Sequence, residues 1–187
     1  MGPMTRRSAR RVGLISDTHG LLRGEALEAL RGSDLIVHAG DIGGPEILDR
    51  LAAIAPVRAV RGNNDRGAWA AAIPEADRVD VGAIALYVLH DVADLAIDPG
   101  ASGCRVVVTG HSHRPAHSVR DGVHFVNPGS AGPRRFRLPV SIARLSVDGD
   151  RIAVELVELT VTPPIPRAVA PPRARGPARR TSRGRAK

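Results

Sequence analysis

A short apolar run that stops at a glycine and an aspartate constrains the fold of this chain most. Residues 35–39 read Leu-Ile-Val-His-Ala, and Gly40-Asp41-Ile42-Gly43-Gly44 follows at once. A continuous apolar run of this length is typical of a strand that is buried on both faces of a parallel sheet. Ligands of open α/β sheets bind beyond the carboxyl ends of such strands. The sequence therefore predicts that Asp41 lies in a functional site.

The residues on either side of this run predict alternating strands and helices. Val12–Ser16 and Val57–Val60 are further short apolar runs. Between the runs, the apolar residues of Leu22–Leu30 recur at helical spacing, and Pro45 begins a second helix that extends to about Ile54. Helices that alternate with strands predict a parallel sheet with right-handed crossovers.

The second half of the chain shows a different pattern of short strands. An irregular connection is expected over residues 66–76, and one or two helical turns over Val92–Ile97. The expected strands are Arg78–Val81, Ile84–Leu89, Arg105–Thr109, Val123–Val126, Ser141–Val147 and Ile152–Leu159. The last two flank Asp148-Gly149-Asp150, which is a hairpin signal. We therefore expect a second, largely antiparallel sheet. The fold class is α/β (α+β), a four-layer αββα sandwich of two packed mixed sheets flanked by helices.

The basic residues are concentrated at the two ends of the chain. The 187 residues carry a net charge of +8, but residues 1–11 and 163–187 hold twelve of the 27 basic residues and no acidic one. We expect a disordered basic arm over residues 1–11, one domain over residues 12–160 and a disordered Pro/Arg/Ala-rich tail over residues 161–187. The arginines at the ends could contact nucleic acid nonspecifically through its phosphates, or could simply be solvated.

Composition excludes several classes of protein. Aromatic residues make up 2% of the chain, so the core must be aliphatic and no aromatic platform can stack nucleic-acid bases. Cys104 is the only cysteine, which excludes an internal disulfide and fits a reducing compartment. No apolar run approaches the roughly 20 residues of a membrane helix, and no secretory signal follows the basic N-terminus. We expect a cytoplasmic protein without membrane contact.

Aspartate, asparagine and histidine stand at the ends of the predicted strands. Asp17 and His19 are two residues apart, so their side chains point the same way on an extended chain, and His111 and His113 repeat this spacing. Carboxylates and imidazoles together suit Mn, Fe or Zn. Each motif alone has a structural alternative, because an Asp after a strand often caps a turn or helix and a loop histidine is often only solvated.

Taken in order, these motifs resemble the calcineurin-like metallophosphoesterases, and within them the small YfcE-like phosphodiesterases. The resemblance extends from about Val12 to Leu159. Its motifs are Asp17-Thr18-His19, Gly40-Asp41, Gly62-Asn63-Asn64-Asp65, His90, Gly110-His111-Ser112-His113 and Asn127-Pro128-Gly129-Ser130. Because the ligand-bearing blocks follow the order and spacing of the family, the resemblance is specific.

The resemblance implies a dimetal phosphohydrolase that acts on phosphate esters, with phosphodiesters preferred to phosphomonoesters. The implied ligands are Asp17, His19 and His113 for one metal ion, Asn63, His90 and His111 for the other, and Asp41 as the bridge between them. A carboxylate has two oxygens and can span ions roughly 3.5–4 Å apart. Two divalent metal ions are expected, Mn²⁺ before Fe, Zn or Ni. A hydroxide that bridges them would attack phosphorus in line.

The chain departs from the family pattern at two places. Many larger relatives carry a histidine that can protonate the leaving group where this chain has Asn64, so we expect a preference for activated esters or phosphodiesters. The family commonly has Gly-His after the ligand at His90, where this chain has Asp91-Val92. Asp41 and Asn64 are the expected catalytic residues. Asn64 and Arg66 are the expected substrate contacts.

A non-catalytic scaffold is the alternative function, because a retromer subunit of the same fold has lost part of its metal ligands. Four residues receive structural interpretations. His38 is expected to be a core residue with its hydrogen bonds satisfied, Trp69 a packing residue, and His117 and His124 surface or strand residues. The sequence leaves the natural substrate and the metal undetermined. It is also compatible with an oligomer.

Overall fold

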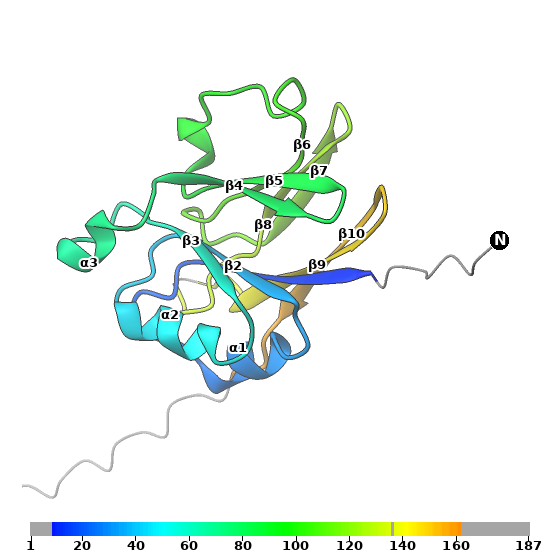
Figure 1. Cartoon of the computed structure of the whole chain (residues 1–187). Helices are drawn as coiled ribbons and strands as arrows, with labels where there is room; N and C mark the ends of the chain where they lie inside the picture. Colours follow the sequence, from blue (N-terminus) through cyan, green and yellow to red (C-terminus); the bar gives the residue numbers. More distant parts are fainter. Residues whose placement is uncertain (1–8, 136, 162–187) are drawn as a thin grey trace, which may run out of the picture.

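The chain forms two five-stranded sheets that pack face to face (Figure 1). The computed structural model describes residues 9–135 and 137–161. Most of the predicted basic arm, and all of the predicted tail except residue 161, lie outside this range. The first strand begins at Arg10 rather than at Val12, so Arg10 and Arg11 belong to the sheet and not to an arm.

The first sheet contains the predicted parallel unit. Its strands, in the order β10-β9-β1-β2-β3, are β1 (Arg10–Ile15), β2 (Leu35–Ala39), β3 (Val57–Val60), β9 (Ser141–Asp148) and β10 (Arg151–Glu158). Strands β1, β2 and β3 run parallel, whereas β9 pairs antiparallel with both β1 and β10. The parallel strand–helix–strand pattern that the sequence predicts is confirmed.

The hairpin of β9 and β10 corrects one expectation, because it joins the first sheet and not the second. The first residues of strand β9 are buried on both faces, with Ile142 in the core beneath the helices, and Leu145 farther along lies in the core between the sheets. A strand of this kind needs cover on both sides. The alternating pattern and the turn signal predict the hairpin itself, but they do not specify which sheet supplies that cover.

The second sheet is mixed. Its strands, in the order β4-β5-β6-β8-β7, are β4 (Ala76–Val81), β5 (Ile84–Leu89), β6 (Cys104–Val108), β7 (Ala116–Arg120) and β8 (Val123–Asn127). Strands β5, β6 and β8 are parallel, and only the edge strands β4 and β7 are antiparallel to their neighbours. The expectation of a largely antiparallel sheet was therefore wrong. Strand β7 was not predicted, because all five of its residues are exposed and show no apolar alternation.

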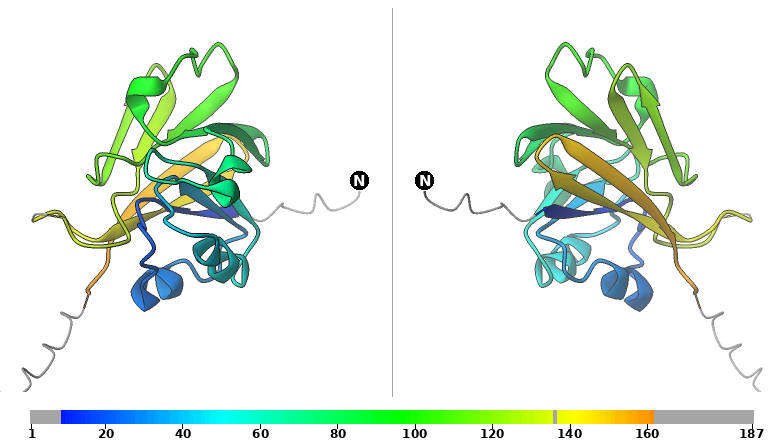
Figure 2. Two further views of the ribbon diagram at one scale, coloured as in Figure 1. Left: turned by 90° about the vertical axis from the view of Figure 1, so that its left-hand side faces the viewer. Right: turned by 90° about the vertical axis from the view of Figure 1, so that its right-hand side faces the viewer.

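Two helices cover the outer face of the first sheet (Figure 2). They are α1 (Gly24–Ala29) and α2 (Pro45–Ala52), and Ile47 and Leu51 of α2 face the sheet one turn apart. A single turn, α3 (Ala68–Ala71), interrupts the connection that was expected to be irregular. The second sheet carries only the 3₁₀ turn η1 (Val92–Asp94) and the loop after it among the described residues. No helix in the described part of the chain is long and apolar enough to cross a membrane.

The core is aliphatic, as the composition predicts. Between the sheets, Leu14 of β1 and Val37 of β2 pack with Leu86 and Val106 of the opposite sheet. Alternate residues of the same strands face the helices, where Ile36 contacts the other core. This packing fixes both sheets relative to one another, and with them the loops that leave their strands.

The carboxyl ends of five parallel strands meet at one edge of the sandwich. The loops after β1, β2 and β3 come from the first sheet, and those after β5 and β6 come from the second. Several contacts join these loops across the sheets, among them two between predicted metal ligands of the first and second sheet. The N–H of His111 donates to Oδ2 of Asp17 at 3.1 Å, and Nε2 of His90 lies 3.4 Å from Oδ2 of Asp41. All the strand-end motifs of the sequence are therefore at this edge.

Candidate metal centre

Backbone strain is concentrated in these loops. Of the six non-glycine residues with positive φ in the described part of the chain, five are predicted metal ligands, with φ between 46° and 64°: Asp17, His19, Asp41, His111 and His113. The sixth, Asp121, lies in the tight turn between β7 and β8. Left-handed backbone at a non-glycine residue costs free energy and persists where the surrounding structure enforces it, typically at functional sites.

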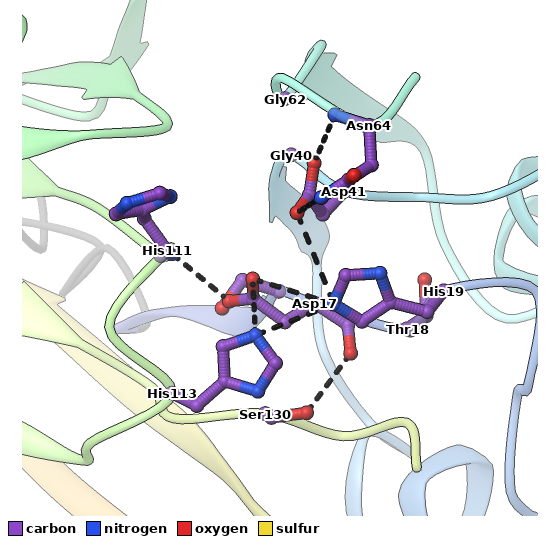
Figure 3. Close-up of polar contacts among 12 residues, drawn as sticks. Asp17, Thr18, His19, Gly40, Asp41, Gly62, Asn64, His111, His113 and Ser130 are labelled. Carbon is purple, nitrogen blue, oxygen red and sulfur yellow. Dashed lines mark hydrogen bonds and ion pairs between the residues drawn. The ribbon is translucent and has the colours of Figure 1, made fainter. Parts of the chain in front are cut away.

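Asp17 is the centre of one group of side chains (Figure 3). It is fully buried, and its Oδ1 lies 3.2 Å from Nε2 of His113 and 3.9 Å from Nε2 of His19. The two Nε2 atoms of these histidines are 3.3 Å apart. One carboxylate oxygen and two imidazole nitrogens therefore face a common point, which is the donor set that the sequence predicts for one metal ion.

Asp41 connects this group to His90. Its Oδ2 lies 3.8 Å from Nε2 of His19 on one side and 3.4 Å from Nε2 of His90 on the other. Nδ1 of His90 donates to the carbonyl of Ala39 at 2.8 Å, which leaves Nε2 as the metal-facing nitrogen of the neutral ring. Ligand atoms of Asp17, Asp41 and His90 all lie within 4.8 Å of one another. Asp41 therefore lies within reach of both groups.

The remaining predicted residues lie at the rim. Asn63 is exposed, and it lines a pocket of about 560 Å³ together with His90 and His111. His111 is not part of either close group, since its Nε2 instead lies 3.4 Å from Oδ2 of Asp91. Arg66 is exposed and forms no hydrogen bond or ion pair with any described residue, so its role stays a prediction.

Asn64 contacts the centre through Asp41. Its N–H donates to Oδ1 of Asp41 at 2.9 Å, and its side-chain amide donates to Oδ2 at 2.6 Å. A residue in the loop after β3 thus donates a hydrogen bond to each carboxylate oxygen of Asp41. Asn64 fixes the orientation of the carboxylate that the sequence predicts to be the bridge.

The residues present fit bound cations. Oδ1 of Asp17 and Nε2 of His90 are buried, and neither has a hydrogen-bond partner among the described residues. Buried polar atoms without a partner are rare and costly unless a ligand satisfies them. Glycines leave the space open, since a Cβ on Gly40 would lie 2.6 Å from Nδ1 of His90 and one on Gly110 would lie 2.7 Å from Oδ2 of Asp17. The donor set is mixed carboxylate and imidazole, which suits divalent first-row metals.

Comparison with known proteins agrees with this geometry. Residues 11–150 match the model of the calcineurin-like phosphoesterase superfamily domain. The chain belongs to this superfamily. A probable metallophosphoesterase of Methanothermobacter thermautotrophicus is 30% identical over 158 residues, which are 78% of this chain and 91% of that protein. Divalent metal ions and phosphate-ester substrates are what membership of this superfamily implies.

Two solved structures share the fold of this phosphoesterase domain. An archaeal phosphodiesterase superposes with a TM-score of 0.67 at 20% identity, over 79% of this chain and 99% of its own. Wild-type Vps29 of Entamoeba histolytica in complex with Zn²⁺ superposes with a TM-score of 0.62 at 23% identity, over 79% of this chain and 98% of its own. The predicted family resemblance and the predicted sandwich fold are both confirmed.

The pKa values of the two aspartates of the candidate metal centre shift in opposite directions. Burial raises the pKa of Asp17 to about 6, because the ionised carboxylate has lost its water. Burial also opposes ionisation of Asp41, but the nearby imidazole of His90 and the hydrogen bonds from Asn64 outweigh it and hold the pKa of Asp41 below its ordinary value. Asp41 is therefore an anion at neutral pH without any cation, whereas Asp17 retains a proton more easily.

The histidines of the domain also differ. Burial lowers the pKa of His19, and burial together with the charge of Arg135 lowers the pKa of His113 to about 4. These two rings are neutral at physiological pH, which is the form that can bind a metal. Burial opposes protonation of His90, but its contacts with Asp41 and the carbonyl of Ala39 raise its pKa. A cation at His90 would therefore compete with a proton more strongly than a cation at His19 or His113 would.

Asp65 is a positioning residue of the phosphoesterase domain that sequence reasoning missed. It is buried, and its Oδ2 accepts the N–H groups of Ile42 at 3.1 Å and Gly62 at 2.8 Å. Its Oδ1 accepts the N–H of Gly43 at 2.8 Å. One carboxylate thus joins the loops after β2 and β3. Its place in the Gly62–Asp65 motif was the available signal, since the side chain of an Asp in a turn often accepts backbone N–H groups.

The residues with structural interpretations occupy the expected places. His38 is fully buried and hydrogen-bonded at both nitrogens, which confirms it as a satisfied core residue. Trp69 packs against the core beneath the helices. His117 is exposed, and it lies on the second sheet beside the partly buried His124, with their ring nitrogens 3.0 Å apart. Ser130 donates to the carbonyl of Asp17 at 2.9 Å, so the Asn127–Ser130 motif helps to fix the loop that carries Asp17.

Proposed function

We propose that this chain is a dimetal phosphohydrolase that prefers phosphodiesters and works with two Mn²⁺ ions in the cytoplasm. One observation carries the proposal. Asp41 belongs with His90, at 3.4 Å, to one of the two groups of side chains that could each hold an ion, and it also lies 3.8 Å from His19 of the other group. A carboxylate in this position can serve two cations at once.

The proposed assignment of ligands follows the sequence. Asp17, His19 and His113 hold one ion, Asn63, His90 and His111 hold the other, and Asp41 serves both. Bound there, the two cations supply Lewis acidity toward the phosphoryl oxygens and an acidified water as the nucleophile for in-line attack. The residues of the chain hold and orient the reacting groups, and Asn64 keeps both oxygens of Asp41 in place.

The preference for diesters with good leaving groups rests on Asn64. An amide cannot give up a proton to a leaving alkoxide, and the backbone nitrogen and the side-chain nitrogen of Asn64 each already donate to Asp41. The leaving group therefore departs without an acid from this position. Arg66 is proposed as a substrate contact because it follows the same loop and its guanidinium is exposed.

The test is a screen of the full chain with added Mn²⁺ over activated and alkyl phosphodiesters and phosphomonoesters. We expect hydrolysis of bis(p-nitrophenyl) phosphate, slower hydrolysis of alkyl esters, and loss of activity in Asp41→Asn. Equal rates on aryl and alkyl esters would contradict the role given to Asn64. Activity that survives Asp41→Asn would contradict the dimetal mechanism.

A non-catalytic scaffold is the second candidate, favoured by the structural likeness to Vps29. The presence of all seven predicted ligand types at their positions argues for the enzyme. Absence of hydrolysis across the screen, with Mn²⁺ bound in the expected amount, would favour the scaffold.

A further inference from the structure

His111 has a carboxylate partner outside the predicted set of ligands. Its Nε2 lies 3.4 Å from Oδ2 of Asp91, at the wall of the pocket that both residues line with His90. The main chain of His111 is fixed, since its N–H donates to Oδ2 of Asp17 at 3.1 Å and its φ is 64°. Only the rotation of the imidazole remains to be set. The ring of His90 lies edge-on to it, with the centroids 5.3 Å apart, and Asp91 is the group that contacts its Nε2.

Asp91 is itself held in place. Its Oδ1 accepts the N–H of Ala93 at 3.0 Å and so caps the 3₁₀ turn η1. The backbone of Asp91 is extended, as is usual for a capping residue. One carboxylate oxygen therefore fixes the residue, and the other oxygen is available to His111. The family pattern has a glycine at this position, which carries no side chain that could do the same.

The partner of a histidine decides which of its nitrogens keeps the proton. Nδ1 of His90 donates to the carbonyl of Ala39, so Nε2 of His90 is the nitrogen with a free lone pair. At His111 the arrangement is reversed. A carboxylate accepts and never donates when it is ionised, so the contact with Asp91 favours the proton on Nε2 and leaves the lone pair on Nδ1.

We propose that Asp91 is a positioning residue for the second metal ion: it keeps the proton of His111 on Nε2 and so presents Nδ1 to the cation. This inference rests on the proposed dimetal function, but it concerns a residue to which the ligand pattern gives no role. Carboxylates behind metal-binding histidines orient the ring and raise its basicity, and their loss typically weakens metal binding by about 10- to 100-fold.

The test compares Asp91→Asn with a matched control, Asp94→Asn, in the full chain. Asparagine caps a helical turn as well as aspartate does, so Asp91→Asn keeps the contact with Ala93 through its amide oxygen, removes the charge and places an NH₂ donor instead of an acceptor toward His111. Asp94 lines the same pocket and forms no ion pair with a histidine among the described residues. Both variants therefore remove the same charge from the same pocket. Only one of them removes the partner of His111.

The first readout is calorimetric titration with Mn²⁺. We expect two sites in the unmodified chain, and Asp91→Asn should weaken one of them by about 10- to 100-fold, whereas Asp94→Asn should change neither by more than about threefold. In an Asn63→Ala background, which removes the second site, Asp91→Asn should leave the remaining site unchanged. Wild-type affinity at both sites in Asp91→Asn would overturn the proposal.

The second readout is independent of metal. Nitrogen-15 NMR of the metal-free chain, recorded on the neutral imidazole, reports which ring nitrogen of His111 carries the proton. We expect Nε2–H in the unmodified chain and in Asp94→Asn, and a mixture of both forms in Asp91→Asn. An unchanged ring in Asp91→Asn would refute the role of Asp91. A chain that binds fewer than two Mn²⁺ ions while the NMR result holds would contradict the dimetal function instead.

Discussion

Oγ1 of Thr18 and Nε2 of His38 lie 2.9 Å apart beneath the metal centre, where they join the loop after β1 to strand β2. Thr18 in turn donates to the carbonyl of Ile42 at 2.8 Å, in the loop after β2. Nδ1 of His38 accepts the N–H of Gly40 at 3.2 Å, so the proton of the ring lies on Nε2. A neutral histidine therefore ties together the two loops that carry Asp17 and Asp41.

Acid should weaken the hydrogen-bonded link that neutral His38 forms between these two loops. Burial lowers the pKa of His38 to about 3, below the ordinary value of 6.5 that it regains on unfolding. The stability that neutral His38 provides is therefore complete above about pH 6.5, and it declines by about 1.4 kcal/mol per pH unit as the pH falls toward 3. Urea unfolding between about pH 5 and 7 should show that His38→Gln lacks this part of the pH dependence.

His117→Gln is the control, because it removes an exposed histidine and keeps His38. At neutral pH, His38→Gln should also lower the free energy of unfolding by about 1–3 kcal/mol, because the N–H of Gly40 loses its acceptor. The same pH slope in the unmodified chain and in His38→Gln would contradict this account.

Asp17 should make the stability of the metal-free chain depend on pH in the opposite direction, and should make metal binding sensitive to acid. Because the pKa of Asp17 is raised to about 6, the ionised form costs stability in the metal-free chain, and this cost grows as the pH rises from 3.8 to 6. A cation needs that ionised form, so the Mn²⁺ affinity of this group should fall by about tenfold per pH unit below pH 6. Calorimetry in buffers of different ionisation enthalpy would also measure the released proton. An affinity that is constant between about pH 5 and 7 would exclude this coupling.

Gly62 should not tolerate a side chain. A Cβ at this position would overlap the carboxylate and the main-chain nitrogen of Asp41, so Gly62→Ala must displace Asp41. Since misplacement of a catalytic group by about 1 Å can cost a factor of 10², we expect hydrolysis to fall by at least about tenfold and the Mn²⁺ content to decrease. Gly24→Ala is the control, because a Cβ there meets nothing within 4 Å. Equal metal content in the two variants would contradict this prediction, because it would show that the loop can shift to accommodate the added Cβ.

The two proposed sites should respond differently to single substitutions. Asp41→Asn removes the charge that both groups share, so the purified variant should hold close to no Mn²⁺, whereas Asn63→Ala should keep about one ion per chain. Metal analysis after dialysis measures both. Asp49→Asn, a change on the exposed face of α2, provides a control for charge loss. One retained ion in both Asp41→Asn and Asn63→Ala would contradict the bridging role.

The sequence predicted most of the secondary structure and the location of the centre. The runs that end at Asp17, Asp41 and Asn63 are buried parallel strands, and the strand ends of a parallel unit must meet at one edge. This is why motifs more than 90 residues apart, such as those of Asp17 and His111, could be assigned to one place before their contact was seen.

The rest was not predictable from local pattern. The pairing of β9 with β1 depends on which sheet can cover Leu145, and β7 lies on an exposed edge where its residues carry no apolar signal. The roles of Asp65 and Asp91 depend on backbone N–H groups and a ring nitrogen that only the folded loops bring close. Sequence spacing fixes the order of such residues but not the rotation of their side chains.

The positive φ angles of the predicted ligands also restrict which amino acids these positions can accept. Asp, Asn and His adopt left-handed backbone several-fold more readily than other non-glycine residues. Asp17, His19, Asp41, His111 and His113 all belong to these types. A β-branched residue would be disfavoured there by the main chain before any metal is considered. The shape of the loops thus selects oxygen and imidazole donors, so the preference for particular cations is in part encoded in the polypeptide backbone.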